Sequence, residues 1–546
     1  MNSIRINRGV FRHIAVLLVG LHLPMFVRGQ LVADGQTNIL NNVITNISGN
    51  LTVGTNGSFT LLVVTNGSTV SNSTDGAIVS IGANASAQSN RLIITDPGTS
   101  WTAIEKVTSS VGQSGSANEL DILNGAKAIN FASYIGQTAP GSNNLVLVSG
   151  AGSTWSNFTV IIGNGGPGNA LIVTNGARVF TIFPASISVV GNSSTSSNNY
   201  ATVSGAGSVW TNSTFVVGTN SSRMNQLNIN NGARFGSAAL SVGAGADSNV
   251  VTVTGAGSVL QCYGILLGTN STGNECVVSN GAALYAGQAG WPTIIQGTAS
   301  SAIITGAGST WSNSVDFTFG QYSNLLSITD GGSLVDRNGL VRLNPGVFGN
   351  TAEDTIVIAG QNSIWNNRGL FSVAEQGLQL FITNGGTLVD GSANFGDFYS
   401  VTGVAGTFGN AIISGTGSLW SSRTNLEIGN VGASNQVVVT DSGMVTAGNL
   451  VIGNAGNGSQ LTVSNSGTVI VTNQLSMSGP FSKLTVSGGS VIVTNSASLA
   501  IASTLAINSG FFTAGSLLAA SNPQPKVLLK GGTLQLGSTI YSNLVP

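Results

Sequence analysis

The chain has 546 residues and a net charge of −1, and only 6% of its residues are charged, against about 25% in ordinary soluble domains. So few lysines and arginines cannot neutralise a row of phosphates or hold an anionic membrane surface, which argues against nucleic acid as a partner. Disorder is also disfavoured, because 41% of the residues are hydrophobic and their burial can offset the entropy lost on ordering the chain.

The first 29 residues differ from the rest of the chain. Arg5, Arg8 and Arg12 precede an apolar run over residues 14–27, and Val27-Arg28-Gly29 follows before Gln30. This pattern predicts a secretory signal peptide over residues 1–29, the alternative being an uncleaved membrane anchor. No later stretch has the roughly 18 uninterrupted apolar residues of a membrane helix. We therefore expect a mature chain without a membrane helix, secreted or held at a cell surface or outer membrane.

A seven-residue motif recurs at a fixed period after this segment. Ser149-Gly-Ala-Gly-Ser-Thr-Trp155 returns in exact or looser copies, each ending at a marker residue, at intervals of 50 to 55 residues. The marker positions are Trp101, Trp155, Trp210, Leu260, Trp311, Trp365 and Trp420, with leucine in place of tryptophan in one copy. A fixed period over more than half of the chain is typical of repeat architecture. We assign residues 49–420 to these Trp-marked repeats.

Each period contains two similar halves. The second half carries a motif such as Leu171-Ile-Val-Thr-Asn-Gly-Ala-Arg-Val179, and a short strand ending in glycine, such as Val160–Gly163, precedes each half. Short β-branched runs separated by Asn-Gly and Gly-Ala-Gly turns predict β-strands. The halves continue without tryptophan after Trp420, so we assign residues 421–546 to degenerate coils of the same kind.

One half-unit of roughly 22 to 28 residues is too short to bury an apolar face alone, but it is long enough for one coil of a parallel β-helix. We therefore predict an all-β fold, a parallel β-helix (β-solenoid) of about 20 coils forming a rod on the order of 100 Å long. The predicted signal helix over residues 1–29 and an N-terminal cap region over residues 30–48 precede it.

The marker tryptophans have two interpretations. They form either an exposed ladder that stacks on sugar rings, or a core column in which each indole N–H binds a turn carbonyl. We favour the core, because a leucine at position 260 suits packing better than sugar stacking. Trp291 lies outside the register, and we expect it to cap a loop, a ligand contact being the less favoured reading.

The chain contains few residues of the kinds that catalyse reactions or bind metal ions. Both histidines, His13 and His22, lie in the signal segment, so the mature chain lacks the usual general base and histidine metal ligands. No P-loop and no calcium-binding nonapeptide series occurs. Cys262 and Cys276 form either two buried free thiols or one disulfide, and the spacing does not decide between them. We predict no catalysis, no cofactor and no metal site.

Acidic residues are mildly concentrated between residues 330 and 397. They are Asp330, Asp336, Glu353, Asp354, Glu375, Asp390 and Asp397. Asp336 and Asp390 occupy equivalent positions two coils apart, which is about 10 Å and long for a glycosidase pair. We interpret these carboxylates as solvated turn residues.

The alternation of S-G-A-G-S-x-W with L-x-V-x-N-G-A/G resembles the repeats shared by type V secretion (autotransporter) passenger proteins and by surface proteins with PEP-CTERM sorting tails. The resemblance covers about residues 45 to 500. It implies an exported β-helical rod and specifies no activity. The terminus, Tyr541-Ser-Asn-Leu-Val-Pro546, has neither a barrel-forming domain nor a sorting tail, so the resemblance leaves the mode of anchoring open.

Three functions compete at this point. The first is a structural or adhesive rod whose partners are polysaccharide or other cell-surface components and an export or anchoring system. The second is a polysaccharide lyase or glycoside hydrolase with a cleft lined by Asp336, Asp390 and Arg337 or Arg342. The third is an ice- or crystal-binding face on the Thr-rich strands, disfavoured by their irregular spacing. We favour the first, partly by analogy of fold.

Overall fold

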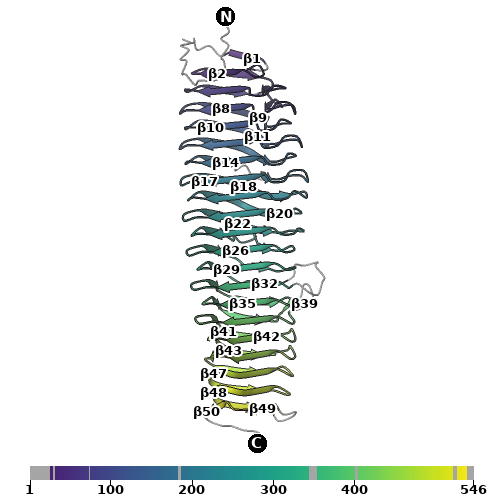
Figure 1. Ribbon diagram of the computed structural model, residues 1–546, viewed down its shortest axis with the longest axis vertical. Coiled ribbons are helices and arrows are strands. Elements are labelled where there is room, and N and C mark those ends of the chain that lie inside the picture. The colour runs from purple at the N-terminus through teal and green to yellow at the C-terminus, as the bar shows by residue number, and fades with distance from the viewer. Residues whose placement is uncertain are drawn as a thin grey trace.

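The computed structural model describes residues 25–28, 31–72, 74–181, 186–342, 353–399, 404–520 and 525–537. These residues form a parallel β-solenoid of about 19 turns, which confirms the predicted fold class. The coils stack into one rod, with β1 and β50 at opposite ends (Figure 1). The predicted signal helix lies outside the described residues, apart from Met25–Arg28, which form β1. Among the described residues there is no helix at all, and hence none able to span a bilayer.

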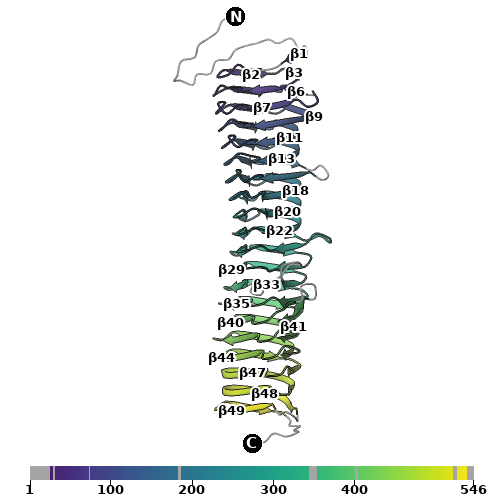
Figure 2. The ribbon, with the colours of Figure 1, turned by 90° about the vertical axis from the view of Figure 1, so that its right-hand side faces the viewer.

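Each coil has three faces, one for each of the three columns of paired strands, and Figure 2 shows the stacked coils from the side. The first face carries a five-residue strand in nearly every coil. Its strands are β2 (Thr37–Asn41), β5 (Leu61–Thr65), β8 (Arg91–Thr95), β10 (Glu119–Leu123), β12 (Leu145–Ser149), β14 (Ala170–Thr174), β17 (Tyr200–Ser204), β19 (Gln226–Asn230), β21 (Val250–Thr254), β23 (Glu275–Ser279), β26 (Ser301–Thr305), β29 (Leu325–Thr329), β32 (Thr355–Ala359), β35 (Gln379–Thr383), β40 (Asn410–Ser414), β42 (Gln436–Thr440), β44 (Gln460–Ser464) and β49 (Lys526–Leu529).

The second and third faces follow the turn after this strand. Second-face strands are β3 (Ile44–Ser48), β6 (Thr69–Asn72), β15 (Arg178–Thr181), β24 (Ala283–Ala286), β27 (Thr310–Asn313), β30 (Ser333–Asp336), β33 (Ile364–Asn367), β36 (Thr387–Asp390), β45 (Thr468–Val471) and β50 (Thr533–Leu536). Third-face strands are β4 (Leu51–Val53), β7 (Ile78–Ile81), β16 (Ile187–Val190), β25 (Thr293–Ile295), β28 (Phe317–Phe319), β31 (Gly339–Arg342), β34 (Leu370–Ala374), β37 (Ser392–Phe395) and β46 (Gln474–Met477).

Some strands bend through more than one face. Those that cover the second and third faces are β9 (Ser100–Val111), β11 (Lys127–Ile135), β13 (Thr154–Ile162), β18 (Val209–Thr219), β20 (Arg234–Ala244), β22 (Val259–Leu267), β41 (Leu419–Ile428) and β43 (Met444–Ile452). β47 (Lys483–Leu499) and β48 (Thr504–Ala519) cover all three faces. β38 (Phe398–Tyr399) and β39 (Val404–Ala405) form a separate antiparallel pair.

Every strand of the solenoid pairs in parallel with its counterparts in neighbouring coils. β14, for example, pairs with β12 before it and with β17 after it, in unbroken register. Side chains alternate along each strand, so Leu171 and Val173 of β14 are buried while Ile172 faces outward. Because the register is kept, equivalent residues of successive coils form columns along the rod, and the inward columns share one continuous core.

Candidate functional site

The marker residues form one buried column. Trp101, Trp155, Trp210, Leu260, Trp311, Trp365 and Trp420 are at most 2% exposed. Residues of intermediate coils stand between them, such as Val179 between Trp155 and Trp210 and Leu334 between Trp311 and Trp365. A tryptophan in every other coil therefore alternates with a smaller side chain, which lets large rings stack within a strand spacing of about 4.8 Å.

Four tryptophans of the column pack against aromatic residues of the third face, namely Trp210, Trp311, Trp365 and Trp420. The ring centroid of Trp365 lies 6.1 Å from that of Phe317 and 5.3 Å from that of Phe371, both in edge-to-face contact. Trp420 continues the series, 6.1 Å from Phe371 and 6.0 Å from Phe395. These rings fill the core, so the marker tryptophans offer no surface to a sugar.

The indole N–H groups bind differently from the expectation. Two residues beyond the tryptophan column lies a second inward position, here called the inner polar column. Its members include Asn130, Asn157, Thr181, Asn212, Ser237, Cys262, Ala286, Asn313, Asp336, Asn367, Asp390 and Ser422.

Each hydrogen bond donated by an indole N–H goes to a side chain of this column in the preceding coil, not to a turn carbonyl. Trp210 Nε1 donates to Thr181 Oγ1 at 3.2 Å and Trp365 Nε1 donates to Asp336 Oδ1 at 3.0 Å. Trp311 Nε1 has no acceptor, and the preceding coil offers Ala286 at this position. The predicted turn-carbonyl acceptor is therefore wrong, because side chains of the inner polar column lie nearer to the indoles.

The interpretation of Asp336 and Asp390 as solvated turn residues is also wrong. Both belong to the inner polar column and are 1% and 0% exposed. Trp420 Nε1 donates to Asp390 Oδ2 at 2.8 Å. Burial raises the pKa of Asp390 to about 7, although hydrogen bonding by Ser422 and Trp420 acts in the opposite direction. Burial likewise raises the pKa of Asp336 to about 7. These two carboxyls line no cleft of the kind that the lyase or hydrolase alternative requires, because both are buried in the core.

Asp354 and Glu375 are buried as well. Asp354 accepts hydrogen bonds from the backbone N–H groups of Gln321 at 2.9 Å and Asn324 at 2.7 Å. Burial raises the pKa of Asp354 to about 6, and burial with the nearby Asp354 charge raises the pKa of Glu375 well above its usual range. Asp330, Glu353 and Asp397 are exposed or half-buried, as expected for turns.

A buried asparagine ladder was not foreseen. An asparagine stands immediately before the first-face strand in successive coils, and its backbone N–H and side-chain amide both donate to the side-chain oxygen of the next one. Asn199 N, for example, donates to Asn225 Oδ1 at 3.1 Å. The ladder comprises Asn90, Asn118, Asn144, Asn169, Asn199, Asn225, Asn249 and Asn274.

The ladder also explains the glycine that ends the third-face strands. A Cβ atom on Gly191, which has φ +79°, would overlap the amide of Asn225. Asp354 takes the equivalent place in the coil after Asn324. The ladder and the inner polar column therefore use many of the buried polar side chains of the rod for its own structure.

Both cysteines are free and buried, so the alternative of a disulfide is wrong. Burial raises the pKa of the Cys262 thiol to about 12, which leaves it protonated and unreactive.

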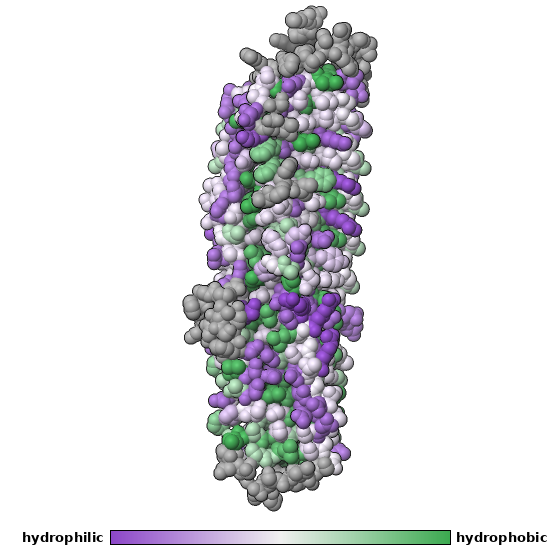
Figure 3. Space-filling view, turned by 180° about the vertical axis from the view of Figure 1, so that it is seen from behind, coloured by the Kyte–Doolittle hydropathy of each residue, from purple (hydrophilic) through white to green (hydrophobic). Residues whose placement is uncertain are grey.

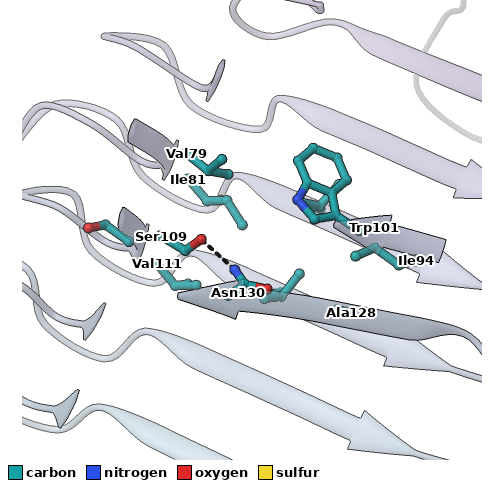
Figure 4. A pocket seen from close by; sticks show the side chains of 11 residues that line it. Val79, Ile81, Ile94, Trp101, Ser109, Val111, Ala128 and Asn130 are labelled. Atoms are coloured by element: carbon teal, nitrogen blue, oxygen red, sulfur yellow. Dashed lines mark hydrogen bonds between the residues drawn. The ribbon is translucent and has the colours of Figure 1, made fainter. Parts of the chain in front are cut away.

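An interior void lies beside Trp101 (Figure 4). Its volume is only about 20 Å³, and its walls include Val79, Ile94 and Ala128. Asn130 donates a hydrogen bond to Ser109 at one side of it. The apolar walls and the absence of a charged lining residue identify it as a packing void, not a substrate site.

The outer surface of the first face carries a column that is polar except at Leu123 and Ala359. It is here called the hydroxyl column and occupies the last position of each first-face strand from β8 to β42. Its members are Thr95, Leu123, Ser149, Thr174, Ser204, Asn230, Thr254, Ser279, Thr305, Thr329, Ala359, Thr383, Ser414 and Thr440.

These residues are spaced unevenly in the sequence because the turns differ in length, yet the register places one in each coil. The column therefore runs for roughly 60 Å at about 4.8 Å per coil. Ser279 Oγ donates to Thr254 Oγ1 at 2.9 Å, and Thr329 Oγ1 donates to Thr305 Oγ1 at 2.9 Å. Such bonds order the hydroxyls along the rod.

Charged groups are sparse on the outside. The side of the rod in Figure 3 mixes hydrophilic and hydrophobic residues along its length. Arg337 Nε lies 2.8 Å from Asp316 Oδ1, and both side chains are exposed or nearly so, so this ion pair contributes little stability. Within the described residues no group of three or more histidine, cysteine or acidic residues could hold a metal ion.

Comparison with models of known protein families and with curated proteins finds no match for this chain. The resemblance to passenger and PEP-CTERM repeats therefore stays a prediction.

Proposed function

We propose that this protein is an exported structural or adhesive passenger of a bacterial cell surface, which binds polysaccharide or other surface components without catalysing a reaction. The hydroxyl column carries this proposal. It presents ordered donors and acceptors at a fixed spacing over many coils, as a repetitive partner requires.

The chemistry of this column suits weak, repeated binding. Each hydroxyl or amide is half-buried, and some are held by hydrogen bonds to the next coil, as in Ser279–Thr254 and Thr329–Thr305. Such ordered groups lose little side-chain entropy when they bind. One such contact is weak. When one contact holds a polymer on the rod, however, it raises the effective concentration of the neighbouring sugar units at the next binding positions, so many weak contacts together give tighter binding. The low charge of the chain favours partners recognised through hydroxyls over highly charged ones.

The predicted signal peptide and the repeat resemblance support export and a place at the cell surface. The alternative, a polysaccharide lyase or glycoside hydrolase on the same scaffold, gains no support from Asp336 and Asp390, because both carboxyls lie inside the rod. A general acid or base must reach the atom whose proton it transfers.

The test is binding of the purified full chain to immobilised polysaccharides and to whole bacterial cells. The variant Thr254→Val/Thr305→Val/Thr329→Val removes three hydroxyls and keeps the side-chain shape. Its matched control is Thr211→Val/Thr387→Val/Thr446→Val, three half-buried threonines of the second face. We expect weaker binding by the first variant only. Absence of binding by the wild-type chain to any surface would contradict the adhesive role.

A further inference from the structure

Three exposed aromatic side chains lie together on the outer surface around β22 and β24. Tyr263 is 44% exposed, Tyr285 47% and Trp291 41%. The rings of Tyr263 and Trp291 have centroids 6.3 Å apart and are tilted by 56°. Leaving such rings in water forgoes the stabilisation that burial gives elsewhere in this rod.

Backbone hydrogen bonds hold the turn that carries Trp291 in place. The backbone N–H groups of Gly287 and Gln288 both donate to the carbonyl oxygen of Tyr263, at 2.9 and 2.8 Å. Trp291 N–H donates to the Gln288 carbonyl at 2.9 Å and closes the turn. This bulged turn widens the rod next to β22 (Figure 2).

Two glycines permit this arrangement. Gly287 has φ +98°, and a Cβ there would lie 2.7 Å from the backbone nitrogen of Ser314. Gly264 lies on β22 under the turn, where a Cβ would lie 2.6 Å from the carbonyl oxygen of Pro292. A side chain at position 264 would push the segment that follows Trp291 away from Tyr263. The backbone therefore fixes the tryptophan beside the tyrosine.

A neutral polar concavity adjoins these rings. Its volume is about 350 Å³, and its lining includes Tyr263, Tyr285, Gln261, Gln288 and Ser312. No charged side chain lines it. Both glutamine side chains are exposed and make no hydrogen bond to another described residue, so their amides are available to a ligand.

We propose that this aromatic platform (Tyr263, Tyr285 and Trp291) binds a pyranose ring of a neutral glycan. The apolar face of the sugar stacks on the rings of Tyr263 and Tyr285, which line the concavity, beside Trp291, which packs against Tyr263. The sugar hydroxyls bind the amides of Gln261 and Gln288. Rigid aromatic side chains with a few adjacent polar groups give contact area at low entropic cost. The proposal rests on the adhesive function above and assigns it a site and a ligand class.

The composition of the lining favours this ligand over others. An acidic polymer needs cations, and the lining has none. A large apolar protein surface needs a wide patch, whereas this concavity alternates rings with amides and with the Ser312 hydroxyl. A neutral sugar offers the same alternation of apolar ring faces and hydroxyls.

The experiment measures the affinity of the full chain for the neutral probes chitohexaose, cellohexaose and mannohexaose and for the acidic probe hexagalacturonate. Trp291→Ala and Tyr285→Ala remove the platform, Trp291→Phe keeps a ring, and Gly264→Val displaces the turn. Tyr200→Ala is the matched control, because Tyr200 is a 36% exposed tyrosine of β17 away from the platform. Circular dichroism confirms that each variant folds.

We expect at least one neutral probe to bind, with Kd raised roughly tenfold or more by each of the alanine variants and by Gly264→Val, and little changed by Tyr200→Ala or Trp291→Phe. N-bromosuccinimide should oxidise Trp291 before the six column tryptophans, and the bound probe should protect it.

Other outcomes overturn the proposal in distinguishable ways. If a neutral probe binds equally well to the alanine variants, the platform is not the site, and the adhesive function stands. Binding only to hexagalacturonate or to whole cells refutes the ligand class and likewise leaves that function in place. No binding of any kind refutes both.

Discussion

The substitution Asp390→Asn should stabilise the rod at alkaline pH. Asp390 is buried, and its Oδ2 accepts a hydrogen bond from Trp420 Nε1. An asparagine keeps an oxygen for that bond and has no charge to bury. The chain already uses asparagine in the same inner polar column, at Asn130, where Trp155 Nε1 donates to its Oδ1 at 3.4 Å.

The magnitude follows from the pKa. Burial raises the pKa of Asp390 from 3.8 to about 7, so the folded state holds its proton more tightly than the unfolded state. The stabilisation that this proton provides is complete below about pH 4 and is lost as the pH rises through 7. At about 1.4 kcal/mol for each pH unit between the two values, the loss at pH 8 is on the order of 4 kcal/mol.

Urea denaturation of the wild type and the variant at pH 8 and pH 4, followed by tryptophan fluorescence, measures this effect. We expect the variant to be more stable at pH 8 by a few kcal/mol and nearly equal at pH 4. Asp336→Asn should behave alike, because burial gives Asp336 a similar pKa. Equal stability of variant and wild type at pH 8 would refute the reasoning. So would a wild type that becomes less stable as the pH is lowered from 7 to 5.

Four further substitutions, at three positions, test the internal packing by thermal unfolding. Trp365→Ala should cost about 3–5 kcal/mol, whereas Trp365→Leu should cost less, since leucine occupies the same column at position 260; equal costs would contradict the column's packing role. Gly191→Ala should destabilise by more than 1 kcal/mol or so, because its φ is +79° and the new Cβ would overlap the Asn225 amide; an unchanged midpoint would contradict the close approach. Ala286→Thr should stabilise by about 1 kcal/mol by giving Trp311 Nε1 an acceptor; a loss of stability would show that the hydroxyl does not reach the indole.

The period of the sequence was sufficient to predict the solenoid. A half-unit of fixed length that cannot bury its own apolar face must stack, and the Trp-to-Leu change at Leu260 indicated a core position. The structure places Leu260 in the buried column at 0% exposure. The number of coils followed from chain length divided by the length of the half-unit.

The inner polar column was missed although a signal was present. Asp336 stands two residues after the inward Leu334, and side chains of a strand alternate with a period of two, so Asp336 must also point inward. The same spacing occurs in Trp155-Ser-Asn157. The charge of Asp336 argues for exposure and its place in the alternation of the strand argues for burial, and the structure follows the alternation.

The outer features could not be predicted from the sequence alone. The threonines of the hydroxyl column are unevenly spaced along the chain, and only the register shows that they align. Likewise, Tyr263 and Trp291 are 28 residues apart, and their proximity depends on the turn held by the Tyr263 carbonyl. Asparagine is so common in this chain that the ladder asparagines did not stand out.

Residue-level hydroxyl-radical footprinting of the full chain, with and without a saturating neutral oligosaccharide, is the most direct test of where this rod binds. The account predicts protection of Trp291, Tyr263 and Tyr285, and of first-face residues near Thr254, with no change at the buried tryptophans. Protection confined to the region around Arg337 and Asp316, or no protection anywhere, would contradict it.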